Sequence, residues 1–422
     1  MTPVRVLLGD GFGVTSRQIA VAVGRSGHEP AVLAPPGRPI PGRPRSVARV
    51  HEVPAFGTDP WAWLARAEAV LGAEPYDVLL PTGEHVAVLA RAPERITAHG
   101  VALAVPSFAA LRRVADRASA ASTLTEIGMP QPAGTVVVHT AEELRQVADP
   151  PLYIKTLLGS HRVERREQLL RLADELDRDG AFVDGAGVLV QEPAAGPVLS
   201  AQAVFEHGRL VAVHAYEHLH GPAVRRSVVA PDIREQVAML GGHLGWHGAL
   251  SLDAVRTASG PAWLDVRPHL AEPGNAAASG TDLAAALIAV SRGERPASMP
   301  WGRPDIRTRQ AHAGVWTAAR AGRRRAAREM LRIALRLEPY RDTAEESLSL
   351  RREPRRIPGA LWSAATALTA PRHTLTKITH RKSQDTLSPA TWRRILAGPP
   401  PKPPRPTAPT AGSHPTQAGP NT

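Results

Sequence analysis

The order of strands and helices changes near residue 108, and this change limits the folds that the chain can adopt. Before it, short apolar runs alternate with segments of helical periodicity, which is typical of an α/β domain with a parallel sheet. After it, strands are paired through short turns such as Glu206-His207-Gly208 and Ser259-Gly260, which is typical of antiparallel hairpins. We therefore predict an α/β domain over residues 1–108 and an α+β domain over residues 109–300.

The expected elements follow from these patterns. In the first domain we expect strands at 4–8, 31–33, 76–80 and 101–105, and helices at 15–26, 59–72 and 84–92. In the second domain we expect strands at 135–138, 152–155, 188–191, 199–206, 209–217, 248–256 and 261–267, and helices at 109–127, 141–147, 164–178, 232–244 and 281–292.

The positive charge of the chain is concentrated after residue 300. Residues 301–422 contain 23 Lys and Arg against 8 Asp and Glu, a net charge of +15, whereas the whole chain carries +12. The preceding body is therefore nearly neutral, at −3. A basic segment suits nucleic acid, anionic lipid or an acidic partner, and its charge does not choose among them. Aromatic residues make up only 4% of the chain, which gives little support to a stacking platform for single-stranded nucleic acid.

This C-terminal region divides into two parts. Residues 301–350 are predicted to form a basic helical extension, helical over 308–337, whose charged face we expect to be solvated, with partner binding as the alternative. Residues 351–422 are rich in Pro, Ser, Thr and Arg, and we predict a largely disordered tail whose removal leaves the body folded. The apolar segment 357–370 is flanked by arginines, but we do not expect it to lie on a membrane surface.

The composition excludes several classes of protein. Without Cys, the chain has no disulfide scaffold, cysteine-ligated zinc or iron–sulfur site, or cysteine nucleophile. No uncharged apolar stretch is long enough to suggest a membrane span, and the N-terminus enters a strand-like run without the features of a signal peptide. We expect a soluble cytoplasmic protein, and a homodimer remains open.

A single lysine, Lys155, stands in the first 300 residues. Only four of the 51 basic residues of the chain are lysines, so this position suggests a need for a compact, flexible ammonium group. Lys155 ends an expected strand and precedes a polar loop, which suits a phosphate contact, although the loop is not a Walker A motif. Chance retention is the alternative reading of this lysine.

The glycine-rich loop Gly9-Asp10-Gly11-Phe12-Gly13 follows the first strand. A dinucleotide site would place an acidic residue at the end of the second strand, but the sequence there reads Ala34-Pro35-Pro36. We therefore interpret the loop as a tight turn and do not predict NAD binding.

Two aspartates lie on the expected hairpin of strands 248–256 and 261–267. A hairpin places residues of adjacent strands side by side, so Asp253 and Asp265 could meet at one Mg²⁺. His214, His218 and His220 alternate along another strand with Tyr216 between them, and we expect them to line a cleft or the surface rather than to bind a metal.

The order of these features resembles that of the ATP-grasp ligases, the superfamily of carbamoyl-phosphate synthetase and biotin carboxylase. The resemblance spans about residues 3–300. Within it, the stretch 246–253 together with Glu272-Pro273-Gly274-Asn275-Ala276 is similar to uncharacterised ATP-grasp proteins of high-GC bacteria. The matching motifs are Asp116-Arg117, Gly128-Met129-Pro130-Gln131-Pro132, Ile154-Lys155, Val190-Gln191-Glu192 with Gly196, Leu252-Asp253, and Leu264-Asp265-Val266-Arg267-Pro268.

The resemblance implies a fold and a set of roles. It implies a Rossmann-like pre-ATP-grasp domain followed by a two-lobed ATP-grasp domain, with ATP and Mg²⁺ as cofactors. The cofactor-binding residues that it implies are Arg117 and Lys155 for the phosphates, and Gln191 and Glu192 for the adenine. Asp253 and Asp265 correspond to the metal ligands, and Arg225-Arg226-Ser227 lies in the loop where the resemblance implies phosphate or carboxylate contacts. We expect Arg226 and Arg267 to act as catalytic cations, with Arg267 as an arginine clamp on phosphate.

Several positions depart from the family pattern. Arg117 replaces a lysine, Val198 stands where an acidic residue often binds the ribose, and Arg267 replaces a neutral amide ligand of the metal. We therefore expect Arg267 to exclude or replace a second Mg²⁺.

The function implied by the resemblance is that of an ATP-dependent carboxylate–amine ligase with an altered metal motif. A carboxylate would be activated as an acyl phosphate and then attacked by an amine, so both substrates are small molecules. The alternative is a degenerate ATP-grasp protein that binds a nucleotide or metabolite without turnover and docks an acidic partner through its basic C-terminus.

Overall fold

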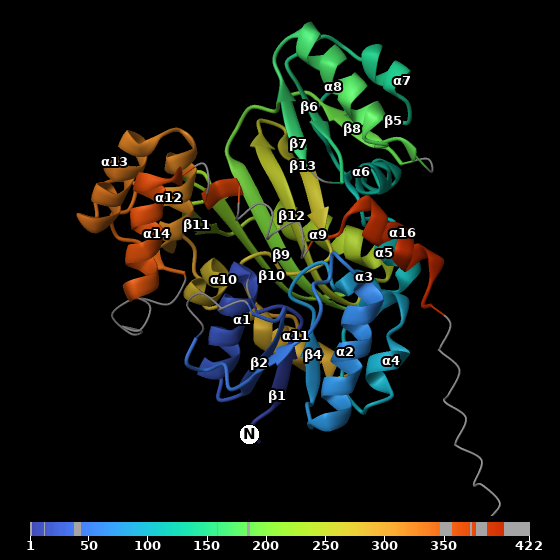
Figure 1. Cartoon of the computed structure of the whole chain (residues 1–422), viewed down its shortest axis with the longest axis vertical. Coiled ribbons are helices and arrows are strands. Elements are labelled where there is room, and N and C mark those ends of the chain that lie inside the picture. The colour runs from blue at the N-terminus through green and yellow to red at the C-terminus, as the bar shows by residue number, and fades with distance from the viewer. Residues whose placement is uncertain are drawn as a thin grey trace, which may run out of the picture.

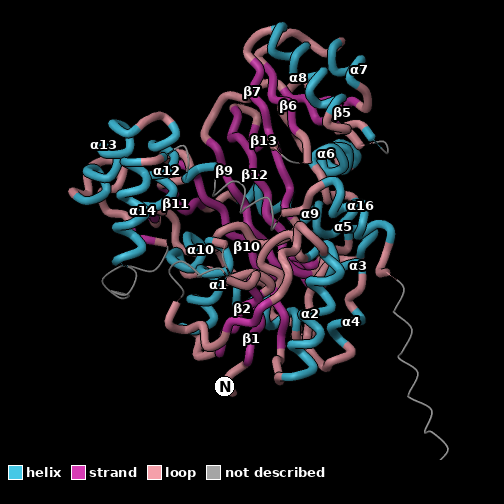
Figure 2. Tube along the Cα trace, in the orientation of Figure 1, coloured by secondary structure: helices cyan, strands magenta, loops and turns pink. Residues whose placement is uncertain are grey.

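The computed structural model describes residues 2–11, 13–37, 44–157, 159–183, 186–346, 357–371, 374–376 and 386–400. Within them the chain forms a mixed α/β structure with three separate β-sheets (Figures 1 and 2). None of the helices in these ranges is both long and apolar enough to cross a membrane.

The first sheet is parallel and has the strand order β3-β2-β1-β4. Its strands are β1 (Arg5–Leu8), β2 (Glu29–Ala34), β3 (Val50–Glu52) and β4 (Val78–Leu80), and its helices are α1 (Val14–Arg25), α2 (Pro60–Ala73), α3 (Val86–Arg91) and α4 (Glu94–Thr97). The expected strand at 101–105 is reduced to an isolated bridge between Ala102 and Val78. The Rossmann-like α/β arrangement predicted for this region is confirmed.

The helix predicted at 109–127 is two helices, α5 (Phe108–Arg112) and α6 (Arg117–Glu126). Asp116 separates them because its carboxylate accepts hydrogen bonds from Ser119, 2.9 Å to the backbone nitrogen, and so caps the start of α6. This cap places Arg117 at the first position of α6.

The second sheet is small and has the order β5-β8-β6-β7. Its strands are β5 (Val136–Val138), β6 (Leu152–Lys155), β7 (Ser160–Val163) and β8 (Val188–Gln191), and the helices α7 (Ala141–Arg145) and α8 (Arg166–Arg178) accompany it. The segment expected to be a polar loop after Lys155 contains β7, which pairs with β6 in antiparallel register. Figure 1 shows this sheet and its two helices at the top of the molecule.

The third sheet has seven strands in the order β13-β12-β9-β10-β11-β14-β15. The strands are β9 (Val198–Glu206), β10 (Arg209–His218), β11 (Val224–Val228), β12 (Gly248–Thr257), β13 (Gly260–Arg267), β14 (Arg307–Arg309) and β15 (Ala344–Glu345). The helices of this part are α9 (Pro231–Leu244), α10 (Gly274–Ser279) and α11 (Leu283–Ser291). The two hairpins are those predicted, whereas β14 and β15 were not expected in the extension. The domain limits at 108, 300 and 350 stay a prediction.

The register of this sheet separates a polar face from an apolar face. Successive cross-strand partners form one row of side chains, and partners share a face because side chains alternate along each strand. The polar row is Asp265, Asp253, Ser200, Tyr216 and Ser227. The neighbouring row of the opposite face is Val266, Leu252, Ala201 and Ala215, and it belongs to the same core cluster as Val237 and Leu240 of α9. The core therefore lies on one side and charged side chains gather on the other.

The C-terminal region forms two helical units. Helices α12 (Ala311–Arg320), α13 (Arg323–Ala334) and α14 (Ile357–Thr369) pack together around Trp316, Ala326 and Ala367. Helix α16 (Pro389–Ala397) packs instead against α2 and α3, on the right of Figure 1.

The prediction of disorder over residues 351–422 is therefore corrected at α14 and α16. The rest of the predicted tail lies mostly outside the described residues. Ile395 is fully buried in the core cluster of the first domain. Arg394 and Thr391 also bond to the body, since the carbonyl of Arg394 accepts from Trp61 Nε1 at 3.0 Å and Thr391 Oγ1 donates to the carbonyl of Gly57 at 2.8 Å.

Docking of α16 predicts a measurable contribution to stability. We expect Ile395→Ala to lower the free energy of unfolding by about 2–5 kcal/mol, because it removes buried methylene groups and leaves a cavity. The matched control is Leu396→Ala at the next position, where the side chain is 38% exposed and the expected cost is below about 1 kcal/mol. Denaturant unfolding measures both variants, and equal stabilities would show that α16 does not pack on the body.

Candidate functional site

Lys155 is buried where the second sheet meets the third. Its ammonium donates to Gln191 Oε1 at 2.7 Å and to the carbonyl of Leu264, on β13, at 3.0 Å. Burial lowers its pKa to about 8, with a further lowering by Arg117 and an opposing effect of Asp265. A buried ammonium of lowered pKa gains stability from an added anion, so the position suits a phosphate.

Arg117 lies beside Lys155 and connects α6 to both sheets. Its guanidinium donates to the carbonyls of Thr156 and Gly159, the latter at 3.3 Å, and its Nε lies 3.7 Å from Asp265 Oδ1. Burial raises the pKa of Asp265, and Arg117 and Lys155 act against this effect. These three charged groups therefore form one cluster.

Asp253 and Asp265 are direct cross-strand partners, as the sequence predicted. Arg267 lies between them, since its Nη2 contacts Asp253 Oδ2 and its Nε lies 3.6 Å from Asp265 Oδ2. On the other side of Asp253, Ser200 Oγ donates to Asp253 Oδ1 at 2.6 Å and lies 3.0 Å from His218 Nε2. Burial, aided by Arg225, lowers the pKa of His218 to about 4, so this imidazole is neutral at pH 7.

A second charged cluster surrounds Arg225 of β11, whose side chain is buried. Its Nη1 donates to Glu346 Oε2 at 2.8 Å and its Nη2 donates to Glu272. Gln310 Nε2 donates to Glu272 Oε2 and to Glu346 Oε2, each at 2.8 Å. Although burial opposes ionisation of Glu272, Arg225 and Gln310 outweigh it and hold the pKa of Glu272 below its usual range.

Glu346 belongs to the C-terminal extension, directly after β15, and its carboxylate is fully buried. Thr308 Oγ1 donates to its Oε1 at 2.6 Å, and Gln18 Nε2, from α1, donates to its Oε2 at 3.3 Å. The N-terminal domain, the large sheet and the extension thus meet at one carboxylate.

Gln191 is the last residue of β8 in the second sheet, and Glu192 follows it. The Gln191 side chain is buried and donates to Thr135 Oγ1 at 3.2 Å while it accepts from Lys155. The backbone nitrogen of Glu192 donates to the carbonyl of Ala133 at 3.0 Å. An adenine role for these residues stays a prediction, and the observed task of Gln191 is to hold Lys155.

Arg226 is not brought together with the other predicted site residues. It is the cross-strand partner of Glu217 and pairs with that carboxylate, whereas its neighbour Arg225 is the partner of His218. Since side chains alternate along a strand, Arg226 lies on the opposite face of the sheet from Asp253. The arginine on the site's face is Arg225, one residue away.

The three alternating histidines have separate partners. His214 Nε2 lies 2.8 Å from Asn275 Oδ1, His218 contacts Ser200, and His220 Nε2 lies 3.0 Å from Glu329 Oε1. Within the described ranges, no group of three or more His, Cys, Asp and Glu is arranged to hold a metal ion.

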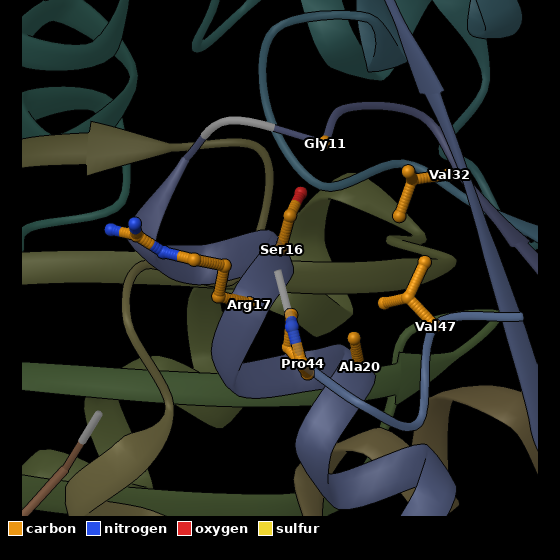
Figure 3. Close-up of a pocket in the computed structure, with 7 residues that line it drawn as sticks. All are labelled: Gly11, Ser16, Arg17, Ala20, Val32, Pro44 and Val47. Atoms are coloured by element: carbon orange, nitrogen blue, oxygen red, sulfur yellow. The ribbon is translucent and has the colours of Figure 1, made fainter. Parts of the chain in front are cut away.

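Charge balance is the main property of the site. The described side chains contribute four carboxylates and four cations, which are Asp253, Asp265, Glu272 and Glu346 with Lys155, Arg117, Arg225 and Arg267. A shallow hollow beside α1, shown in Figure 3, is lined by Gly11, Ser16, Arg17, Ala20, Val32, Pro44 and Val47 and contains none of these groups.

Sequence reasoning missed Arg225, Gln310 and Glu346 as one constellation. Nothing in the sequence around Glu346 distinguishes it from the other charged residues of the extension.

We predict that Glu346→Ala lowers the free energy of unfolding by about 3–5 kcal/mol, because it removes a partner from a buried ion pair and leaves Arg225 incompletely compensated. The matched control is Glu338→Ala, which removes a 64% exposed carboxylate paired with Arg307 and costs at most about 1 kcal/mol. Thermal and denaturant unfolding measure both. A cost for Glu346→Ala no larger than that of the control would show that the extension does not complete this cluster.

Comparisons with known proteins find similar structures but no similar sequences. No protein-family model matches the sequence, and no curated protein sequence matches it. Among solved structures, L-amino acid ligase from Bacillus licheniformis aligns with a TM-score of 0.54 and 16% identity, over 69% of this chain and 75% of that one. A biotin carboxylase–β,γ-ATP complex from Campylobacter jejuni aligns with a TM-score of 0.59 and 13% sequence identity. The alignment covers 72% of this chain and 74% of that one.

Phosphoribosylamine–glycine ligase from Thermotoga maritima aligns with a TM-score of 0.55 and 20% identity, over 72% of this chain and 78% of that one. The chain therefore shares its overall fold with these ligases and this carboxylase.

Proposed function

We propose that the protein is an ATP-dependent ligase that activates a carboxylate as an acyl phosphate for attack by an amine. The observation that carries the proposal is the buried ammonium of Lys155 between the two sheets, with Arg117 beside it. Two cations at this junction suit the phosphates of ATP, and the fold supports the same placement.

The reaction requires two bond exchanges. A carboxylate oxygen attacks the γ-phosphorus, the bond from that phosphorus to the bridging oxygen breaks, and ADP leaves. The amine nitrogen then attacks the acyl carbon, the carbon–oxygen bond to phosphate breaks, and the nitrogen loses a proton as inorganic phosphate leaves.

The protein contributes positioning and charge neutralisation to these steps. Lys155 and Arg117 would orient the phosphates, and Arg267 would stabilise the charge that moves onto the transferred phosphoryl group. The charged cluster around Arg225 would keep the end of the site rigid, since Arg225 is paired with both Glu272 and Glu346.

The fold family implies a Mg²⁺ ion, for which Asp253 and Asp265 are the candidate ligands. Asp253 and Asp265 supply the oxygen ligands that Mg²⁺ prefers, but Arg267 contacts both. The residues in this arrangement therefore do not fit an ion between the two carboxylates unless Arg267 moves aside.

A second candidate is a protein that binds a nucleotide without turnover. The specific observation in its favour is that Arg267 pairs with both proposed metal ligands, so the site is balanced without a metal. In this alternative, the basic C-terminal region would also bind an acidic partner.

Trapping with hydroxylamine distinguishes the two candidates without knowledge of the amine. An acyl phosphate reacts with hydroxylamine to give a hydroxamate, so pools of carboxylic acids with ATP should yield a hydroxamate and an equal amount of ADP. If nucleotide binds but no pool yields either product, the candidate without turnover is favoured.

Lys155 gives a pH-dependent prediction. The ammonium of the free protein has a pKa of about 8, and bound phosphates raise it, so affinity for a non-hydrolysable ATP analogue should fall as pH rises through 8. We expect Lys155→Ala to weaken binding by roughly tenfold to a hundredfold at pH 7, the worth of a charged hydrogen bond, and to remove the pH dependence. Calorimetry measures both, with Arg171→Ala on the exposed side of α8 as the control, and unchanged affinity of Lys155→Ala would contradict the phosphate role.

Arg267 gives a prediction about metal stoichiometry. Removing the guanidinium frees Asp253 and Asp265, so Arg267→Asn should increase the number of Mg²⁺ ions bound with the ATP analogue. Asp265→Asn should reduce the magnesium dependence of nucleotide affinity. Arg256→Asn, on the same sheet but paired with Asp232, is the matched control. Two Mg²⁺ ions bound to the unmodified protein would refute this role of Arg267.

A further inference from the structure

Helix α13 carries two kinds of exposed side chain on one face. Arg324, Arg328, Leu331 and Leu335 follow one another at spacings of four, three and four residues, so they form a single stripe. Leu331 is 56% exposed and Leu335 is 60% exposed. Packing among the described residues does not explain large apolar side chains of this exposure next to arginines.

A hollow lined by arginines continues this stripe toward the start of α13. Its lining residues are Ala321, Gly322, Arg323, Arg324, Arg325 and Arg328. Arg324 and Arg328 belong to both the hollow and the stripe, so the basic and the apolar parts form one continuous surface. Residues 320–341 contain eight Arg and only two Glu, which makes this surface strongly positive.

The neighbouring helix α14 adds further exposed apolar groups. Leu361 is 65% exposed and Trp362 is 67% exposed, although α14 packs on α12 and α13 through Ala367 and the Trp316–Ser363 hydrogen bond of 3.1 Å. Figure 1 shows the three-helix unit at the side of the molecule, away from the small sheet, with α13 on its outer side.

We propose that the outer surface of α13 and α14 binds the protein peripherally to an anionic lipid bilayer. Arginines attract anionic headgroups, and leucine and tryptophan side chains insert into the boundary between headgroups and acyl chains. From the sequence we expect residues 357–370 not to lie on a membrane surface, but the packing of α14 against α13 brings the two helices with exposed apolar side chains into one unit.

Charge and shape favour a bilayer over other anionic partners. The apolar side chains stand on convex helices, and a deformable bilayer accepts them without a complementary groove. Nucleic acid would use the arginines but gains nothing from exposed leucines. The inference is independent of the ligase proposal, since it involves none of the residues of that site.

Vesicle binding of the full-length protein tests the proposal. We expect the protein to sediment with vesicles of phosphatidylcholine mixed with phosphatidylglycerol, less so as salt increases, and not with vesicles of phosphatidylcholine alone. Arg324→Gln with Arg328→Gln should weaken binding by roughly fivefold per arginine. Leu331→Ser with Leu335→Ser should weaken it by about tenfold or more, because insertion is lost.

The matched controls lie on α8, another exposed helix. Leu170→Ser, at a 38% exposed leucine, and Arg171→Gln should leave vesicle binding unchanged. Circular dichroism and thermal unfolding verify that each variant is folded, and Leu361→Ser with Trp362→Ser provides a second apolar variant on α14.

Three results would overturn the proposal. One is sedimentation with neither kind of vesicle, and another is equal sedimentation with both kinds. The third is vesicle binding that both apolar double variants retain in full, which would show simple charge attraction. Binding to RNA in the absence of vesicle binding would assign the arginines to nucleic acid and would also refute the bilayer.

Discussion

The charged side chains on the polar face of the large sheet pair with one another, and the pair of Arg225 and Glu346 is buried. Removing an ion from water is costly unless an opposite charge and hydrogen bonds replace its hydration. Arg225 meets this requirement through Glu272 and Glu346, and Arg267 meets it through Asp253 and Asp265. Because Glu346 follows β15 and also accepts from Gln18 of α1, the pairing of these charges fixes how the extension and the first domain sit against the sheet.

Sequence reasoning succeeded where the relevant contacts are local. The cross-strand pairing of Asp253 and Asp265 could be predicted because a short turn at Ser259-Gly260 sets the register of the hairpin. The rarity of lysine in an arginine-rich chain singles out Lys155, but it does not predict the burial that the structure shows. The pairing of Arg225 with Glu346 spans 121 residues, and no local pattern indicates which of many glutamates meets which arginine. The sequence also does not tell which of Arg225 and Arg226 faces the site. Only the observed register of β10 and β11 assigns Arg225 to that face and Arg226 to the opposite one.

The tail illustrates why average composition is a weak guide to short segments. Residues 351–422 are poor in apolar side chains as a whole, but α16 concentrates Trp392 and Ile395 on one side of nine residues. One buried side chain and a few hydrogen bonds to the body are enough to place such a helix, because the ordering entropy is paid by nine residues and not by the whole tail. The helix pair α13 and α14 shows the converse, since its apolar side chains remain exposed although the helices form.

The charge balance of the site sets the energetic condition for a reaction. Under the proposed function, ATP would bring several negative charges into a region whose cations already have carboxylate partners, so its binding would exchange internal ion pairs for contacts to phosphate. Arg267 is the group whose exchange matters most, because it holds Asp253 and Asp265 together. If phosphate draws Arg267 away, the two carboxylates are left facing each other, and their repulsion favours a cation between them. If Arg267 stays, the carboxylates remain neutralised and the phosphates meet only Lys155 and Arg117. Under the proposed function, the contact of Arg267 with both carboxylates would therefore decide between a ligase and a protein that holds a nucleotide without turnover.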